Sequence, residues 1–111
     1  MPKAPPPPPL AVRRILKTLG ENVAIARRKR KLSQELVAER ALTTRQTIAR
    51  IERGDPSVAF GTWATVLFVL GLHEQLAELA DPKRDELGLA LESQRLPQRI
   101  YTPRSRFAAK E

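Results

Sequence analysis

The chain of 111 residues contains no cysteine and a single histidine. Without cysteine, disulfides and thiolate metal sites are excluded, and one imidazole cannot supply a zinc pair. The sequence also lacks a glycine-rich phosphate loop and any Cys/His pair, which argues against an enzyme. We therefore expect no metal, no cofactor and no catalytic residue, and the absence of disulfides favours a reducing, cytoplasmic setting.

Long apolar runs are also absent. The longest, Trp63 to Leu72, is interrupted by Thr65 and Gly71 and is far shorter than a membrane span. The proline-rich beginning of the chain does not resemble the apolar region of a signal peptide. We expect no membrane insertion.

Acidic residues are few where the chain begins. The formal net charge is +8. Residues 1–19 carry four cations and no acid, residues 20–81 carry nine cations against eight acids, and residues 82–111 carry seven against four. A nearly neutral central part with basic ends suits a DNA-binding core whose arms touch phosphate.

The stretch from Ser33 to Gly54, SQELVAERALTTRQTIARIERG, contains two short helical patterns joined by a tight break. Small or apolar residues recur at helical spacing in each pattern. Ser33 and Thr44 are suited to cap the two helices, and Gly54 is suited to end the second one. We interpret this stretch as a DNA-binding helix-turn-helix.

The second helix of this motif has one apolar side, formed by Ile48 and Ile51. The remaining positions give a cationic, amide-bearing face of the kind that reads a major groove. That face contains Arg45, Gln46, Ala49, Arg50 and Arg53.

Two features precede the motif. The proline run Pro5–Pro9 predicts a stiff, extended segment, either a disordered leader or a ligand for an SH3-like groove. The pattern then becomes helical from Leu10 to Lys31, and Gly20 marks the expected beginning of the domain's first helix. Five consecutive cations, 27–31, suit the C-terminus of that helix, and we expect one or two of them to approach phosphate.

After the motif, Asp55-Pro56-Ser57 predicts a turn. Thr62 is then expected to cap a fourth helix, 63–70, which is apolar nearly all round. One side should cover the core, and the excess indicates a partner surface, with a second copy of the chain as a candidate. The residues assigned to this dimer surface are Trp63, Leu67, Phe68 and Leu70.

The remaining chain contains a short fifth helix, 73–79, expected to offer Leu76 and Leu79 to the core. We divide the chain into a largely disordered basic leader (1–18), a helix-turn-helix domain (19–81) and a basic tail (82–111). The tail has a possible short helix, 85–92, and is either disordered or ordered by DNA or a protein partner. Four apolar residues favour the second alternative: Leu96, Ile100, Tyr101 and Phe107.

The segment LSQELVAERALTTRQTIARIERG resembles the Cro and phage-repressor type of helix-turn-helix, often called the XRE family. The resemblance spans roughly residues 19–79. It implies an all-α, five-helix, phage-repressor-like domain, here with a flexible N-terminal leader and C-terminal tail. It also implies binding to double-stranded operator DNA as a homodimer.

Residue roles follow from the same resemblance. Gln34, beside the cap Ser33, would bind phosphate at a helix N-terminus. Thr44, Arg45 and Gln46 would open the recognition helix, with Arg45 and Gln46 facing base edges. Thr47 and Arg53 would contact phosphate, and Arg50 either base or phosphate. Arg27 and Glu52 would form a structural ion pair, and Leu42 stands where the family often has glycine.

A narrower resemblance follows the motif. The stretch RGDPSVAFGTWATVLFVLGL, with the later segments DELGLAL and RLPQRI, is similar to HipB-type antitoxins. This resemblance implies a repressor of its own operon that also binds a HipA-like serine/threonine kinase toxin. The alternative is an XRE-type regulator without a toxin partner.

Overall fold

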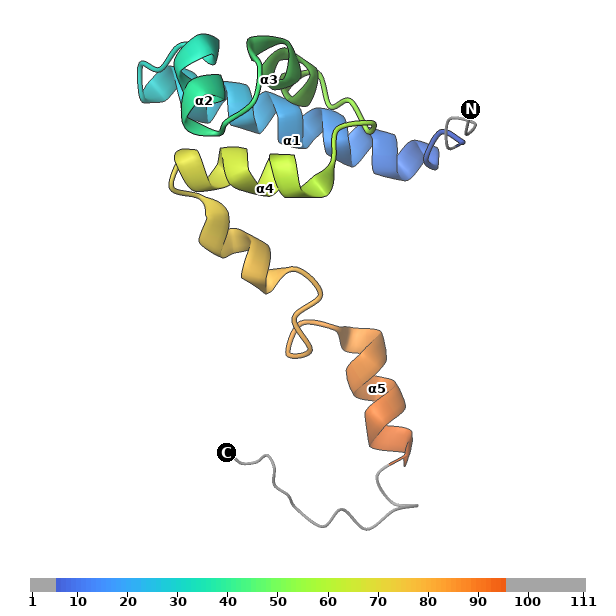
Figure 1. Ribbon diagram of the computed structural model, residues 1–111. Coiled ribbons are helices and arrows are strands. Elements are labelled where there is room, and N and C mark those ends of the chain that lie inside the picture. Colours follow the sequence, from blue (N-terminus) through green and yellow to red (C-terminus); the bar gives the residue numbers. More distant parts are fainter. Residues whose placement is uncertain (1–5, 96–111) are drawn as a thin grey trace. The chain divides into compact units, whose positions relative to one another are not determined.

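The computed structural model in Figure 1 describes residues 6–95, whose regular elements are all helices, with no strand among them. The all-helical fold class is thus confirmed. The helices of the first unit, residues 1–77, are α1 (Leu10–Lys29), α2 (Gln34–Arg40), α3 (Arg45–Glu52), α4 (Phe60–Val69) and most of the 3₁₀ helix η1 (His73–Glu78). The second unit, residues 78–111, contains α5 (Glu86–Arg95). None of the described helices is long and apolar enough to cross a membrane.

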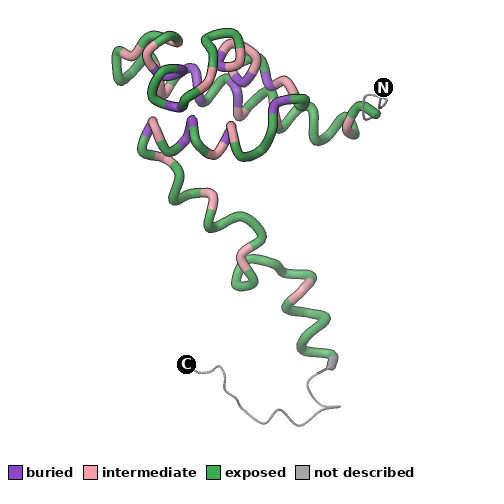
Figure 2. The backbone as a smooth tube through the Cα atoms, viewed as in Figure 1, coloured by how far each residue is buried: buried purple, intermediate pink, exposed green. Residues whose placement is uncertain are grey.

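The core of the first unit lies where α1, α2, α3 and α4 meet, as the buried positions in Figure 2 show. Apolar residues at helical spacing supply it, and these side chains are removed from water, the main favourable term in folding. The most deeply buried are Val23, Val37, Ile48, Ile51 and Val66. The core therefore packs α3 against α1 and α2 against α4.

Helix α1 begins at Leu10, before the predicted start of the domain at residue 19. Helix α1 follows Pro9 and continues without a break through Gly20 to Lys29. Residues 10–18 are therefore helical, so assigning them to a disordered leader was wrong. The proline run covers 5–9, of which the structure describes 6–9.

Gly20 marks a close approach of two backbones instead of a helix start. A Cβ atom on Gly20 would lie 2.5 Å from the carbonyl oxygen of Ile51 and 2.8 Å from that of Glu52. A Cβ atom on Gly54 would lie 2.7 Å from Cα of Lys17. Only glycine fits where α1 crosses the end of α3, because both neighbours are main chain.

Helices α1 to α4 each end with a residue in the left-handed conformation, followed by the paired hydrogen bonds of a Schellman motif. Gly54 (φ 77°) and Gly71 (φ 79°) serve α3 and α4, as glycine does without strain. Lys31 (φ 57°) and Leu42 (φ 58°) serve α1 and α2. Leu42 therefore adopts the left-handed turn conformation, although it stands where the family often has glycine.

We predict that Leu42→Gly raises the free energy of unfolding by about 1 kcal/mol, because it relieves left-handed strain. The leucine side chain is 93% exposed, so its removal sacrifices little packing. Arg40→Gly, at the last residue of α2 and without a positive φ, should instead lower that free energy by about 1 kcal/mol. Urea denaturation followed by circular dichroism measures the free energy of unfolding of both variants. A change of the same sign in the two variants would contradict the strain at Leu42.

Helix α4 begins earlier than expected and has no side-chain cap. It begins at Phe60, after Ala59, so Thr62 lies inside the helix and its predicted role as a cap is wrong. The buried positions 63, 66, 67 and 70 recur at three- and four-residue spacing, which makes a single core-facing stripe.

This stripe corrects the predicted dimer surface. Trp63 is 5% exposed, Leu67 7% and Leu70 3%, so all three are used within one chain. Of the four residues assigned to that surface, only Phe68, 63% exposed, keeps its side chain available to a second copy. It packs edge-to-face against His73, with ring centroids 4.9 Å apart.

The predicted fifth helix is the 3₁₀ helix η1. Leu76 packs against the core as expected, but Leu79 is 62% exposed, so its assignment to the core was wrong. In the second unit, the predicted helix 85–92 is confirmed as α5, with bounds shifted toward the C-terminus. The predicted anchors Leu96, Ile100, Tyr101 and Phe107 lie outside the described residues.

Candidate nucleic-acid interface

Both helices of the motif begin with the expected caps. The Ser33 hydroxyl accepts a hydrogen bond from the Leu36 amide at 3.0 Å, and the Thr44 hydroxyl accepts one from the Thr47 amide at 3.1 Å. The hydroxyl oxygens of Thr44 and Thr47 are themselves 3.0 Å apart. The first turn of α3 is therefore fixed by side-chain bonds as well as by its backbone.

The two sides of α3 differ sharply in exposure. Ile48 and Ile51 are fully buried, which fixes the rotation of α3 about its own axis. Arg45 and Gln46 at its beginning are exposed, as are Thr44 and Arg53, whereas Thr47 and Arg50 are half-buried. The predicted recognition face is thus turned to solvent at the N-terminal end of the helix.

The side chain of Gln34 connects this face to the scaffold. Its amide nitrogen donates to Glu52 Oε1 at 2.9 Å, and its amide oxygen accepts from Arg45 Nη1 at 3.2 Å. These two bonds join the beginning of α2 to both ends of α3, and sequence reasoning did not anticipate them. They orient Arg45 in the free protein.

The ion pair expected between Arg27 and Glu52 is present. Arg27 Nε and Nη2 donate to the two carboxylate oxygens of Glu52 at 2.6 and 3.1 Å, while Nη1 donates to the carbonyl of Leu32 at 2.9 Å. The side chains are 12% and 8% exposed. This bidentate pair ties α1 to α3 and makes Arg27 part of the scaffold, not of the basic surface.

Arg50 lies in a second polar cluster, which includes the predicted turn at 55–57. Its Nε donates to Asp55 Oδ2 at 3.1 Å, and its Nη2 donates to the Ser57 hydroxyl at 2.6 Å. Hydrogen bonds from Ser57 and Arg50 lower the pKa of the Asp55 carboxyl from 3.8 to about 2. In the free protein Arg50 therefore holds the loop after α3, and its contact with DNA stays a prediction.

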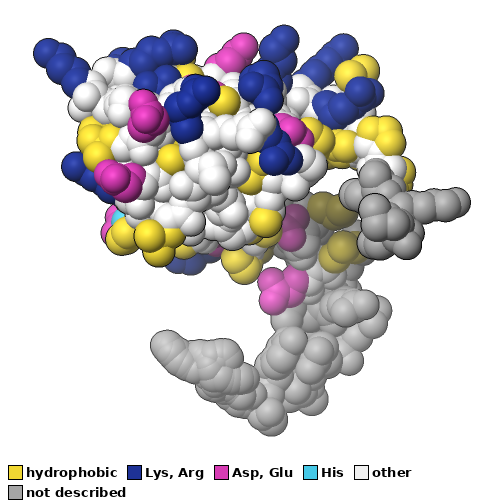
Figure 3. All heavy atoms as spheres, turned by 45° about the horizontal axis from the view of Figure 1, so that its top comes forward, with side chains coloured by type: hydrophobic (Ala, Val, Ile, Leu, Met, Phe, Trp, Pro, Cys, Tyr) yellow, Lys and Arg dark blue, Asp and Glu magenta, His cyan; other side chains and the backbone are white. Residues whose placement is uncertain are grey.

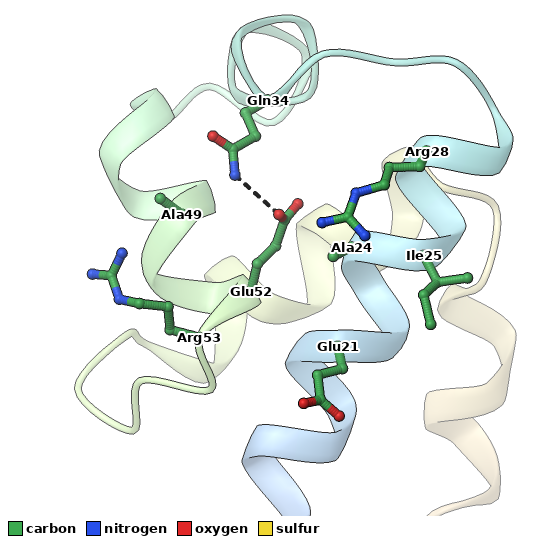
Figure 4. Close-up of a pocket in the computed structure, with 8 residues that line it drawn as sticks. All are labelled: Glu21, Ala24, Ile25, Arg28, Gln34, Ala49, Glu52 and Arg53. Carbon is green, nitrogen blue, oxygen red and sulfur yellow. Dashed lines mark hydrogen bonds between the residues drawn. The ribbon is translucent and has the colours of Figure 1, made fainter.

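A groove of about 460 Å³ lies between α1 and α3 beside the beginning of α2. Figure 4 shows Gln34 and Glu52 bonded at its centre, with Arg28 reaching in from α1 and Arg53 at the end of α3. The space-filling view in Figure 3 shows Lys and Arg side chains gathered along the upper edge of the side that carries α2 and α3.

These features together define a class of protein. Two short capped helices, the second with buried isoleucines and an exposed Arg-Gln pair, form a helix-turn-helix within an all-helical domain. Cations beside the recognition helix supply the charge that phosphate binding requires. This arrangement is that of a DNA-binding regulator.

Comparison with known proteins agrees with that class. Residues 23–76, just under half of the chain, match the family model described as Helix-turn-helix. The match supports an XRE-type, DNA-binding transcriptional regulator. No curated protein and no solved structure matches the chain.

Proposed function

We propose that the chain is a transcriptional repressor that binds operator DNA with α3 in the major groove. The observation that carries this proposal is the geometry of Arg45: it is exposed at the beginning of α3 and is held by Gln34, which Glu52 holds in turn. An arginine fixed in this way keeps less conformational freedom to lose on binding. Its guanidinium suits the two acceptors of guanine, and the neighbouring Gln46 amide suits adenine.

The other predicted contacts position the protein on the duplex. Ser33 and Gln34 stand at the N-terminus of α2, Thr47 lies in the first turn of α3, and Arg53 follows its last turn. Contacts to phosphate fix register without reading sequence. In this proposal Arg50 contacts phosphate or base by exchanging its bond to Asp55 for a bond to DNA.

We expect Arg45→Ala and Gln46→Ala each to weaken binding to the preferred duplex by about 1–3 kcal/mol and to relax base preference at one position. Gln34→Ala should weaken binding to both duplexes by removing a predicted phosphate contact. It should weaken binding to the preferred duplex more, because it also releases Arg45. Fluorescence anisotropy with a duplex selected from a randomised library, and with an unrelated duplex, measures both effects.

Arg40→Ala is the matched control, since it removes one exposed arginine at the end of α2, outside the predicted face. It should leave the ratio of the two affinities unchanged. Unaltered selectivity in both Arg45→Ala and Gln46→Ala would refute the groove assignment.

The repressor is proposed to act as a homodimer through the exposed face of α4. Phe60 is 68% exposed and Phe68 63%, and both lie on one side of the helix, eight residues apart. Small side chains, Gly61, Ala64 and Thr65, lie between them. No charged residue occurs in α4, so two such faces can pack without burying a charge.

We predict that sedimentation at micromolar concentration gives a dimer for the native chain and a monomer for Phe68→Glu. The phenylalanine is mostly exposed, so this change should leave the fold intact. Leu42→Glu, which alters an exposed leucine of the helix-turn-helix turn, is the control and should remain a dimer. A native chain that sediments as a monomer at tens of micromolar would rule out this interface.

A second proposal is that the repressor is a HipB-like antitoxin that binds a HipA-like kinase. It is supported by the resemblance of residues 53–72 and by the leucines of α5, where Leu87 is 70% exposed and Leu91 51%. These two leucines are one helical turn apart and offer an apolar surface to a protein partner.

The neighbouring genes and co-expression test this proposal. A kinase-like reading frame beside the gene is expected, and its product should co-purify with the full chain. Leu87→Asp/Leu91→Asp should abolish capture while preserving DNA binding. No neighbouring kinase, or no capture by the native chain, would favour the regulator without a toxin partner.

A further inference from the structure

The beginning of α1 extends the domain beyond the family match. The match begins at residue 23, whereas α1 begins at Leu10 and runs unbroken to Lys29. The close contact of Gly54 with the backbone of Lys17 seats this extension against the loop that follows α3. The extension is thus a fixed part of the first unit, next to Arg53.

The charge of the extension is unfavourable for an isolated helix. A helix N-terminus favours acids, yet the first turn of α1 has none and Arg13, Arg14 and Lys17 follow in the next turns. All three are exposed. The ion pairs within residues 6–95 are Arg27–Glu52, Arg50–Asp55 and Arg84–Glu78, so these cations have no acidic partner there. A polyanion would compensate this arrangement.

Helical spacing places all three of these cations on the side of α1 that lines the groove. Glu21, Ala24 and Arg28 line the groove with Gln34 and Arg53. Positions 13, 14 and 17 precede Glu21 by eight, seven and four residues and so lie on the same side of the helix. Arg13, Arg14 and Lys17 therefore continue the groove side toward the N-terminus of α1.

The length of the groove side determines what it can reach. Fifteen residues separate Arg13 from Arg28, about 22 Å of helix at 1.5 Å per residue. A turn of DNA measures about 34 Å. A helix that lies along the duplex with its groove side inward can touch phosphates beyond those that α2 and α3 cover.

We infer that Arg13, Arg14 and Lys17 form a second phosphate-binding site for double-stranded DNA, outside the base-reading surface. The site adds affinity without sequence preference, since phosphate contacts carry no base information. It rests on the proposed function in one respect, that DNA is the partner.

The test compares the salt dependence of binding for two double variants. Arg13→Gln/Lys17→Gln removes two charges from the groove side. Lys29→Gln/Arg30→Gln removes two charges from the same helix at positions turned by about 100° and 200° from Arg28. Affinities of the full chain are measured from about 50 to 200 mM KCl. The probes are the duplex selected from a randomised library and an unrelated duplex, each about 40 base pairs or four helical turns long.

The slope of log K against log salt should fall in magnitude by about 1.8 per protomer for Arg13→Gln/Lys17→Gln, at about 0.9 per phosphate. Raising KCl fourfold should then reduce the affinity of this variant less than that of the native chain, by a factor of about 10 for each protomer bound. The ratio of affinities for the two duplexes should stay unchanged. Lys29→Gln/Arg30→Gln should keep the native slope, as should the charge-preserving Arg13→Lys/Lys17→Arg.

The inference would be overturned if Arg13→Gln/Lys17→Gln kept the native salt slope, or if the slope fell equally in both Gln double variants. A native chain that binds the two duplexes equally would instead refute the proposed sequence-specific function. In that case the salt dependence of binding to the unrelated duplex still tests the phosphate-binding site by itself. The two failures are therefore distinguishable.

Discussion

Replacing Glu52 with alanine is expected to lower the free energy of unfolding by about 3–5 kcal/mol. The carboxylate accepts three side-chain hydrogen bonds, two from Arg27 and one from Gln34. Its removal leaves the Arg27 guanidinium, 12% exposed, without a counter-charge. Because small domains are stable by only about 5–15 kcal/mol, this loss is a large share of the total.

Urea denaturation of Glu52→Ala and of Glu39→Ala gives the comparison. Glu39 is exposed on α2, so its replacement should change the free energy by no more than about 0.5 kcal/mol. A joint replacement, Arg27→Met/Glu52→Leu, should recover much of the loss, because apolar residues can substitute for a buried ion pair. Equal effects of Glu52→Ala and Glu39→Ala would show that the pair contributes nothing.

Gly20→Ala is expected to destabilise the protein by about 3 kcal/mol, the upper part of the usual range for overpacking. The added methyl group would lie 2.5 Å from the carbonyl oxygen of Ile51, and neither helix backbone can yield as a flexible side chain can. Relief requires that α1 move away from α3, which also stretches the ion pair between Arg27 and Glu52.

Gly61→Ala is the matched control, because this glycine is also helical and a Cβ atom there meets nothing within 4 Å. It should be neutral or stabilising by up to about 1 kcal/mol. Thermal unfolding followed by circular dichroism separates the two changes. If Gly20→Ala were as stable as Gly61→Ala, the close crossing of α1 and α3 would be wrong.

The sequence predicted the features that depend on neighbours in the chain. Ser33, Thr44 and Gly54 act locally, through bonds to residues within a few positions, and each takes its expected place. The pair of Arg27 and Glu52 is distant in sequence and was expected only from the resemblance to phage repressors. Residue patterns alone do not specify it.

Features that depend on how helices cross were missed. Gly20 suggested a boundary because glycine disfavours helices, but its backbone contact with α3 exists only in the fold. The bonds of Gln34 to Arg45 and Glu52 likewise require the crossing of α2 and α3. In α4 the spacing of 63, 66, 67 and 70 could have identified the core side, but the neighbouring apolar residues obscured it.

The most direct test of the account is a crystal structure of the protein with its selected duplex. It should show α3 in the major groove, Arg45 and Gln46 within hydrogen-bonding distance of base edges, and the N-terminus of α2 at a phosphate. Gln34 should keep its bond to Glu52, because that bond belongs to the scaffold. A complex in which α3 faces away from the DNA, or in which Arg45 contacts no base, would contradict the account.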